Sequence, residues 1–319
     1  MFEYRAATID DAPAMRDLIA RAEAFDGAPR VLELDELIEE LTGGAVDLAD
    51  GSMLAIADGR TVGSMVVSHR RSEIIEQRCF LEGTVDPEFR GQGVGRTLID
   101  FGIDRATTLL RAIDDDLPKF IRLHGYDHIE SVHRLAARMG FAPIRYFDDL
   151  LRPLTDVPER RSIEGLRIMP WPEGRDEEIR IAKNTAFLDH WGSIPTPESA
   201  WHDLLHGYGG RPDLSFIAVD ASTDQVVAEL VTSRYAADDE LLGRSDGWIQ
   251  ILGTLREWRG RGVGSALIIE ALHAYRAAGL THASIGVDSE NPSGAARLYR
   301  NLGFEPDHRI IAHQITLEP

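Results

Sequence analysis

The sequence contains a single cysteine, Cys79, among 319 residues. One cysteine excludes an internal disulfide framework and any zinc site built on cysteine ligands. The chain also lacks a run of about 18 apolar residues that could cross a membrane. It does not start with a cationic segment followed by an apolar stretch. We therefore expect no membrane span and no signal peptide, and a cytoplasmic protein that is a monomer or a homodimer.

Positive charge is scarce as well. Lysine and arginine together number 34 against 53 acidic residues, which gives a formal net charge of −19. Residues 1–160 carry 19 − 30 = −11 and the remainder 15 − 23 = −8, so neither half is a basic module. This argues against nucleic acid as the main partner. An acidic surface keeps the protein solvated, and it also steers cationic substrates weakly.

The chain repeats itself. Residues 85–95 read Val-Asp-Pro-Glu-Phe-Arg-Gly-Gln-Gly-Val-Gly, and residues 254–264 read Thr-Leu-Arg-Glu-Trp-Arg-Gly-Arg-Gly-Val-Gly, an offset of 259 − 90 = 169. Each copy follows a strand-like run and precedes a helical pattern. Residues 138–141 and 301–304 both carry Gly-Phe at a helix end, where glycine is favoured. These landmarks indicate a tandem duplication.

The duplication predicts two domains, residues 1–155 and 156–319, joined at a polar, proline-containing seam around residues 152–161. In each half the expected order is strand, helices, two strands, glycine turn, helix, strand, helix, strand. Alternating runs at 52–58 and 61–68, and again at 214–219 and 226–233, are typical of hairpins. The predicted fold is α/β (α+β), with a mixed, mostly antiparallel sheet flanked by helices in each domain.

The glycine turn between a strand and a helix suits an anion. Its backbone N–H groups form a nest, and the helix dipole adds favourable potential, so a diphosphate is the natural occupant. A dinucleotide-fold loop does not fit, because no third glycine follows at the required spacing, and a P-loop is excluded because no Gly-Lys-Ser/Thr follows. The alternative is a tight turn in which the glycines serve packing only.

The duplicated turn, with a downstream Asn…Tyr-x-x-x-Gly-Phe, resembles the GNAT superfamily of acetyl-CoA-dependent N-acyltransferases. The resemblance covers both halves, and it implies that loop amides hold the coenzyme A pyrophosphate while the preceding strand bonds the pantetheine. It also implies a bulge that splays two strands apart. The implied acetyl-CoA-binding residues are Thr84, Val85, Arg90, Gly91, Gln92, Gly93, Val94, Gly95 and Arg96 in the first half, and Leu252, Gly253, Thr254, Arg259, Gly260, Arg261, Gly262, Val263, Gly264, Ser265 and Asn291 in the second.

The two halves differ in the later motif. In the family, a tyrosine at the position of Tyr299 acts as general acid to the leaving thiolate. The alternative role of Tyr299 is packing on a helix face, and that of Asn291 is a plain helix cap. The same count in the first half gives Ala136 and His128, which supply neither group. We therefore expect a degenerate first domain, either structural or coenzyme-binding, and a catalytic second domain.

The general base is harder to find. Counting six residues back from Thr254, where many family members carry glutamate, gives Trp248, and the same count from Val85 gives Cys79. Asp246 is nominally on the same strand face and is the candidate base. Asp288 and Glu290 are further options, as is an acceptor that needs no protein base.

Residues 184–195 interrupt the helical period in a region that borders the acceptor pocket in the family. His190 and Trp191 are therefore candidates to line that pocket, with a structural corner as the alternative. No metal site is expected, because the histidines of the first half lack the spacing of metal ligands.

The expected function is acetyl-CoA-dependent transfer of an acetyl group to a small-molecule primary amine, in the second domain. The two-unit organisation is similar to the mycothiol synthase family, which acetylates a cysteinyl amine, although that family carries the strand glutamate where Trp248 stands here. A protein that binds or senses acetyl-CoA without turning it over is the alternative from another class. We expect no nucleic acid and no membrane as partners.

Overall fold

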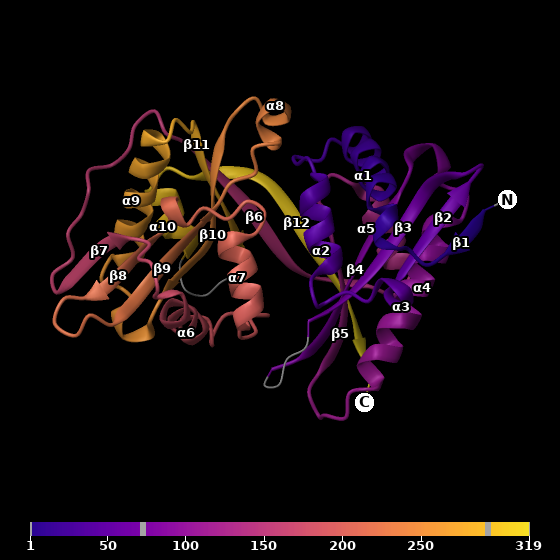
Figure 1. Cartoon of the computed structure of the whole chain (residues 1–319), viewed down its shortest axis with the longest axis horizontal. Helices are drawn as coiled ribbons and strands as arrows, with labels where there is room; N and C mark the ends of the chain where they lie inside the picture. The colour runs from indigo at the N-terminus through magenta and orange to yellow at the C-terminus, as the bar shows by residue number, and fades with distance from the viewer. Residues whose placement is uncertain (1, 71–74, 291–294, 319) are drawn as a thin grey trace. The chain divides into compact units, whose positions relative to one another are not determined.

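The structure is a computed structural model that describes residues 2–70, 75–290 and 295–318. It contains two compact units (Figure 1): unit 1 is Met1–Tyr146 with Arg309–Pro319, and unit 2 is Phe147–His308. Each unit is a mixed sheet with helices packed on it, so the predicted fold class is confirmed in both.

Unit 1 contains the elements β1 (Glu3–Arg5), α1 (Ala12–Asp26), α2 (Leu34–Thr42), α3 (Leu48–Gly51), β2 (Ser52–Ala57), β3 (Arg60–Arg70), β4 (Gln77–Val85), α4 (Val94–Arg111), β5 (Lys119–Tyr126) and α5 (Glu130–Arg138). Its strands lie in the order β1-β2-β3-β4-β5-β12, and β4 runs antiparallel to β3 but parallel to β5. The hairpin from β2 to β3 turns at Asp58 and Gly59, which both have positive φ, as such a tight turn requires.

Unit 2 contains the elements β7 (Leu166–Pro170), α6 (Asp176–Ala186), α7 (Glu198–His206), β8 (Phe216–Asp220), β9 (Val226–Ser233), α8 (Asp238–Leu242), β10 (Asp246–Thr254), α9 (Val263–Ala277), β11 (His282–Asp288) and α10 (Ala295–Asn301). The strand order is β7-β8-β9-β10-β11-β6, with β10 antiparallel to β9 and parallel to β11. Unit 2 therefore repeats the strand plan of unit 1.

The last strand of each unit comes from the other half of the sequence. Residues 147–153 of β6 (Ala142–Pro153) pair antiparallel with β11 in unit 2, and residues 310–317 of β12 (Glu305–Leu317) pair antiparallel with β5 in unit 1. A cut at 155/156 would separate both strand segments from the strands with which they pair. The domain boundary at 155/156 stays a prediction.

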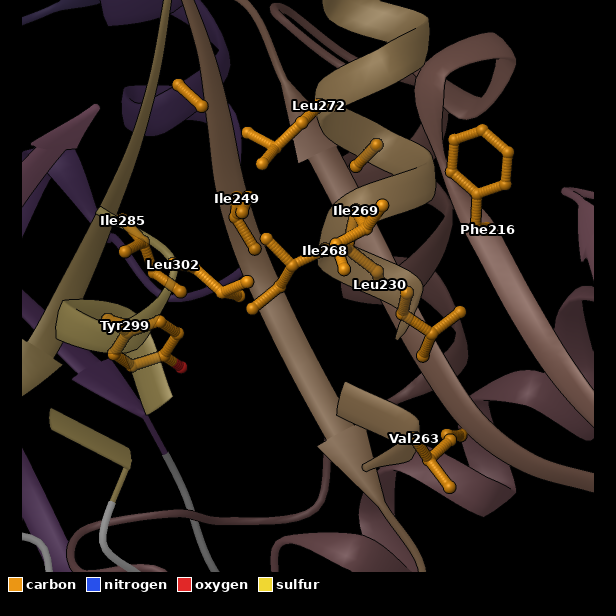
Figure 2. Close-up of a cluster of buried hydrophobic side chains, with 14 of the residues drawn as sticks. Phe216, Leu230, Ile249, Val263, Ile268, Ile269, Leu272, Ile285, Tyr299 and Leu302 are labelled. Carbon is orange, nitrogen blue, oxygen red and sulfur yellow. The ribbon is translucent and has the colours of Figure 1, made fainter. Parts of the chain in front are cut away.

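The sheet of unit 2 packs on both faces. One face meets α9 in a cluster that includes Ile249, Ile268 and Ile285, which Figure 2 shows together. The other face meets α6 and α7, where Val231 packs with Ile179 and Trp201. Along β11, whose pairing is regular, side chains alternate between the two faces. Burial of these two apolar faces is the main stabilising contribution to the unit.

Unit 1 follows the same plan. Cys79 and Leu81 of β4 pack with Leu98 of α4 on one face, whereas Leu54 of β2 packs with Met15 of α1 on the other. Burial raises the pKa of the Cys79 thiol to about 12, so this cysteine is an inert core residue. Within the residues that the structure describes, no helix is both long and apolar enough to cross a membrane.

Candidate active site

The glycine loop of unit 2 joins β10 to α9 through a short turn, Arg256–Trp258. Gly260 and Gly262 have φ of 75° and 84°, a conformation that disfavours other residues, and Gly262 is the N-cap of α9. Among the described residues, no hydrogen bond to a backbone carbonyl uses the N–H groups of 260–265. Free N–H groups at a helix N-terminus form an anion site.

Unit 1 builds the same loop between β4 and α4. Gly91 and Gly93 have φ of 77° and 92°, and apart from its chain neighbours no described residue would come within 4 Å of a Cβ placed on either. The two loops carry their second arginine at different places. Unit 2 has Arg261, whose guanidinium lies 4.6 Å from the Trp258 ring centroid, where unit 1 has Gln92, and unit 1 has Arg96 on α4 where unit 2 has Ser265. Both loops are shaped for an anion.

The motif arginines bond protein groups. Arg259 donates from Nε to the carbonyl of Thr254 at 3.0 Å, from Nη2 to the carbonyl of Ala186 at 2.6 Å, and from Nη1 to Asp189 at 2.7 Å. The hydrogen bond from Arg259 to Asp189 lowers the pKa of this carboxyl to about 2. The sequence predicted that Arg259 binds the cofactor. It did not single out Asp189, although the next two residues, His190 and Trp191, were predicted to line the acceptor pocket. The structure gives the arginine a loop-positioning role.

The strands part beside this loop. β10 and β11 pair from Asp246↔His282 to Ile249↔Ile285, and the pairing of β10 with β9 shifts register between Ile249 and Ile251. This is the bulge that the resemblance implied. Beyond it, residues 252–254 pair with β9 on one edge, and among the described residues no strand pairs with their other edge.

In unit 1 the strands also part, but the described residues of β3 and β4 pair without a register shift. The parallel pairing of β4 with β5 ends at Phe80↔Arg122, while β3 and β4 stay in register from Gly63↔Val85 to Arg70↔Arg78. Thr84 and Val85 therefore pair with β3 alone, as the corresponding residues do with β9 in unit 2. The backbone edge is open in both units, and the bulge that turns backbone groups out of the regular pairing lies in β10 of unit 2.

Tyr299 lies on α10, near the place where the strands part. Its side chain is buried, its ring lies 6.0 Å from that of Phe304, and burial raises the pKa of its phenol. Figure 2 shows the ring beside Ile285 and Leu302 with the hydroxyl oxygen directed away from both. Among the described residues, this hydroxyl has no hydrogen-bond partner. Such a phenol stays protonated at neutral pH and is free to donate.

Arg152 of β6 donates a hydrogen bond to the carbonyl of Leu302, which fixes the end of α10 to the sheet.

The two units differ at the position of Tyr299. Ala136 of α5 is fully buried at the corresponding position of unit 1 and carries no proton. Asn291, the second motif residue, lies outside the described residues.

Asp246 lies away from the parted strands. It is the first residue of β10, seven residues before Gly253, or about 23 Å along an extended strand. Its carboxylate accepts a hydrogen bond from Arg244 at 3.1 Å, and Arg244 also binds Asp307. The structure therefore puts Asp246 in an ion-pair network, and its catalytic role stays a prediction.

His190 and Trp191 lie in the connection between α6 and α7. The ring of His190 is 5.3 Å from that of Phe187, and the indole of Trp191 is 6.2 Å from the ring of Phe147 on β6. Both side chains are half-buried. This connection therefore reaches across to β6 on the face of the sheet opposite α9.

A buried carboxyl escaped the sequence analysis. Glu229 of β9 is fully buried, and among the described residues neither of its oxygens has a hydrogen-bond partner. It lies against Gly253, where an added Cβ would be only 1.8 Å from Oε1. Burial raises the pKa of Glu229 to about 8, and Lys183 lowers it in part. The signal was one acidic residue within an apolar run.

Metal ligands do not gather in the part of the chain that the structure covers. No group of three or more histidine, cysteine, aspartate or glutamate side chains that could hold a metal ion occurs among the described residues. The chemistry that the geometry can support here rests on backbone N–H groups, an open strand edge, a phenol and carboxyl groups.

Comparison with known proteins identifies relatives for both units. A model of the acetyltransferase (GNAT) family matches residues 20–141 and 177–304. The chain is 28% identical over 319 residues to the mycothiol acetyltransferase of Nocardiopsis dassonvillei, and this alignment covers 92% of this chain and 91% of that protein.

Solved structures agree over the whole length. A GCN5-related N-acetyltransferase from Sphaerobacter thermophilus matches with a TM-score of 0.78 and 26% identity, covering 100% of this chain and 96% of that one. A tandem GNAT protein from the clavulanic acid biosynthesis pathway matches with a TM-score of 0.73 and 16% identity, covering 100% and 99%. The second likeness shows the fold alone.

Proposed function

Because the chain belongs to the acetyltransferase (GNAT) family and is an N-acetyltransferase, we propose that unit 2 transfers the acetyl group of acetyl-CoA directly to a small-molecule primary amine. The observation that carries this proposal is the phenol of Tyr299, buried and unpaired among the described residues, beside the parted strands of unit 2. Unit 1 has Ala136 at this position.

The residues of unit 2 fit acetyl-CoA. The N–H groups of 260–265, with the dipole of α9 behind them, would hold the diphosphate, and the guanidinium of Arg261 adds positive charge. The open edge of β10 at residues 252–254 would bond the pantetheine through its backbone. When bound, the coenzyme supplies an acetyl group activated as a thioester.

Tyr299 would hold its proton until the sulfur leaves. Its raised pKa keeps the phenol protonated at neutral pH, so the O–H is available to donate as negative charge develops on sulfur. The hydroxyl would provide the same stabilisation to each thiolate that departs, whichever amine attacks. Tyr299 therefore serves the donor half of the reaction and leaves the choice of acceptor to other residues.

Unit 1 is proposed to bind coenzyme or to support the fold without turnover. Its loop has the same positive-φ glycines, but the strand bulge and the phenol have no counterpart there. The cofactor-binding roles of Arg90–Arg96 are proposals for this reason. Each unit has an anion-shaped loop, but of the two corresponding positions 136 and 299 only the second carries a phenol, which supports a single reaction site in unit 2.

The acceptor is a small amine in this proposal, and a cysteinyl amine is the leading candidate because the relatives with matching length are named mycothiol acetyltransferases. Trp248 of β10 in place of a strand glutamate favours a different acceptor within the same class. A protein that binds acetyl-CoA without turnover is the competing function, supported by the lack of a carboxylate at that position of β10.

Thiol release from acetyl-CoA, measured across a panel of amines, tests the proposal. The panel contains a cysteinyl glucosamine conjugate, glucosamine, kanamycin and a lysine-containing peptide, and mass spectrometry identifies the acetylated product. We expect amine-dependent release with at least one small molecule and none with the peptide. Tight acetyl-CoA binding without release for any amine would instead identify a binding or sensing protein.

A further inference from the structure

A carboxyl group stands over a glycine at the point where the strands of unit 2 part. Asp149 of β6 is the register partner of Gly286 on β11. A Cβ placed on Gly286 would be 3.3 Å from Oδ1 of Asp149 and 3.4 Å from Cζ2 of Trp248. The carboxyl and the indole edge therefore share the space that the missing side chain leaves.

This space lies one residue beyond the last paired position of β10 and β11. Ile249 and Ile285 form the final pair and both pack toward α9, so Gly286, the next residue of β11, faces the opposite side. Trp248 precedes Ile249 and faces the same side as Gly286. Asp149 is thus presented on the sheet face where the connection from α6 to α7 runs, beside the open edge of β10.

Aromatic side chains flank the carboxyl group on this face. Phe147, two residues before Asp149 on β6, points to the same side, and its ring lies 6.2 Å from the indole of Trp191. Trp248 closes the other flank. A carboxylate beside aromatic rings suits an amine ligand, because the carboxylate pairs with the ammonium group and the rings offer apolar surface to the adjoining carbon atoms.

The charges around Asp149 leave it without a counterion. Among the described residues it forms no hydrogen bond or ion pair, and burial, together with Asp307 and Asp148, raises its pKa to about 7. The nearby cation Arg244 is taken by Asp246 and Asp307, and His308 lies 3.4 Å from Asp307. A ligand cation would supply the missing partner.

We propose that Asp149 binds the acceptor amine of unit 2 as its ammonium ion and then serves as the general base for acetyl transfer. The proposal rests on the proposed function of unit 2, and the acceptor it implies is a primary amine whose adjoining group lies against Trp248, Phe147 and Trp191. This places a catalytic residue from the first half of the sequence in the site of the second unit.

Protons and bonds balance in this arrangement. Asp149 first takes one proton from the ammonium ion and releases it to solvent, which leaves a neutral amine. The amine nitrogen then forms a bond to the thioester carbonyl carbon, the carbon–sulfur bond breaks, and Asp149 takes the second nitrogen proton. Tyr299 donates its proton to the departing sulfur, and the proton on Asp149 returns to Tyr299 through solvent.

Unit 1 fills the corresponding place differently. Leu123 of β5 packs toward α4, so the next residue, His124, faces the opposite side, and its ring lies 5.5 Å from that of Phe80. The register partner of His124 on β12 is Ala312. Unit 1 therefore has the His124 side chain at the place of Gly286, and Ala312 at the place of Asp149. The carboxylate is therefore specific to the unit that has Tyr299.

The kinetic test compares Asp149→Asn with Asp148→Asn, using the most active amine of the panel at pH 8.5, where Asp149 is ionised in the unmodified protein. We expect Asp149→Asn to lower kcat/KM for the amine by about 10²-fold while the KM for acetyl-CoA stays unchanged. Asp148 lies on the other face of β6, and its variant should keep the full rate. A rate within twofold for Asp149→Asn, or a joint loss of acetyl-CoA binding, would overturn the proposal.

Gly286→Leu is the second variant, since it fills the same space without removing a charge. We expect it to weaken amine use and leave acetyl-CoA binding intact. The unmodified protein should also show an acid limb near pH 7 in its kcat/KM profile that is absent from Asp149→Asn. Full activity of Gly286→Leu would overturn the location of the amine site.

A readout without turnover separates this proposal from the proposed function. In carboxyl ¹³C NMR of the coenzyme-free protein, the signal lost in Asp149→Asn should titrate near pH 7 and move to lower pH on addition of glucosamine or cysteamine. A signal that titrates near pH 4 and ignores both amines would overturn the inference even if thiol is released. Absence of thiol release with every amine would instead overturn the proposed function.

Discussion

Arg259 binds Asp189 through two hydrogen bonds, from Nη1 to Oδ2 at 2.7 Å and from Nη2 to Oδ1 at 3.1 Å. Arg90 binds Asp26 in unit 1 in the same way, at 2.6 and 2.7 Å. Each arginine also donates from Nε to the last carbonyl of the preceding strand. Asp26 is the last residue of α1, and Asp189 follows the end of α6 by three residues, so in both units this ion pair ties the glycine loop to the C-terminal end of that helix.

The first prediction concerns this tie. Asp189→Asn should weaken acetyl-CoA binding in unit 2 about fivefold, because a partly exposed ion pair contributes about 1 kcal/mol and its loss frees the loop. Calorimetric titration with acetyl-CoA measures the change. Asp213→Asn is the matched control, since Asp213 forms a similar two-bond pair with Arg211 away from the loop. Equal weakening in both variants would mean that the effect is a general loss of charge.

The second prediction concerns two buried tyrosines. Tyr299→Phe should lower turnover by about 10²-fold and leave the free energy of unfolding unchanged or higher, because its hydroxyl has no hydrogen-bond partner among the described residues. Tyr275→Phe should do the reverse, since the hydroxyl of Tyr275 shares a 2.7 Å hydrogen bond with Thr232 in the core. Removing it should cost about 1 kcal/mol of stability without changing turnover.

Thiol release and denaturant unfolding, run on both variants, provide the two readouts. An unchanged rate for Tyr299→Phe would remove the general-acid role. A rate lost equally in both variants would show that turnover reports core packing instead.

The third prediction uses the raised pKa of Glu229, about 8 against an ordinary value of 4.5. Below pH 4.5 the carboxyl is neutral in both the folded and the unfolded chain, so its raised pKa does not change the free energy of unfolding there. As pH rises toward 8 the unfolded chain loses this proton first, and folding becomes progressively less favourable. Glu229→Gln should therefore stabilise the protein at pH 9 and have little effect at pH 4.5. Denaturant unfolding at both pH values measures this effect. An equal change in the free energy of unfolding at pH 4.5 and pH 9 would refute the raised pKa of Glu229.

Much of the site was predictable because it is local in sequence. The glycine loops, the helices that follow them, and the contrast between Tyr299 and Ala136 all come from short motifs, and the repeat itself revealed the two-unit fold. Positive φ at Gly93 and Gly262 is what such a motif requires.

The rest depends on contacts that no local pattern encodes. Asp189 and Asp26 meet their arginines across 70 and 64 residues. Asp149 reaches the site through the exchange of last strands, which two similar repeats cannot reveal. Equal distances before the two glycine loops also lead to different faces of the sheets. Trp248, which precedes the bulge in β10, faces away from α9, whereas Cys79 in the regular β4 packs toward α4.

Thiol release by Gly262→Asp and Gly93→Asp tests most directly whether unit 2 carries the reaction. Both residues have strongly positive φ, and Gly279, with φ of 82° and open space around it, supplies a control for backbone strain, which costs about 1–2 kcal/mol. We predict that Gly262→Asp abolishes amine-dependent thiol release, while Gly93→Asp and Gly279→Asp retain it. Loss of release in Gly93→Asp with full activity in Gly262→Asp would contradict the account.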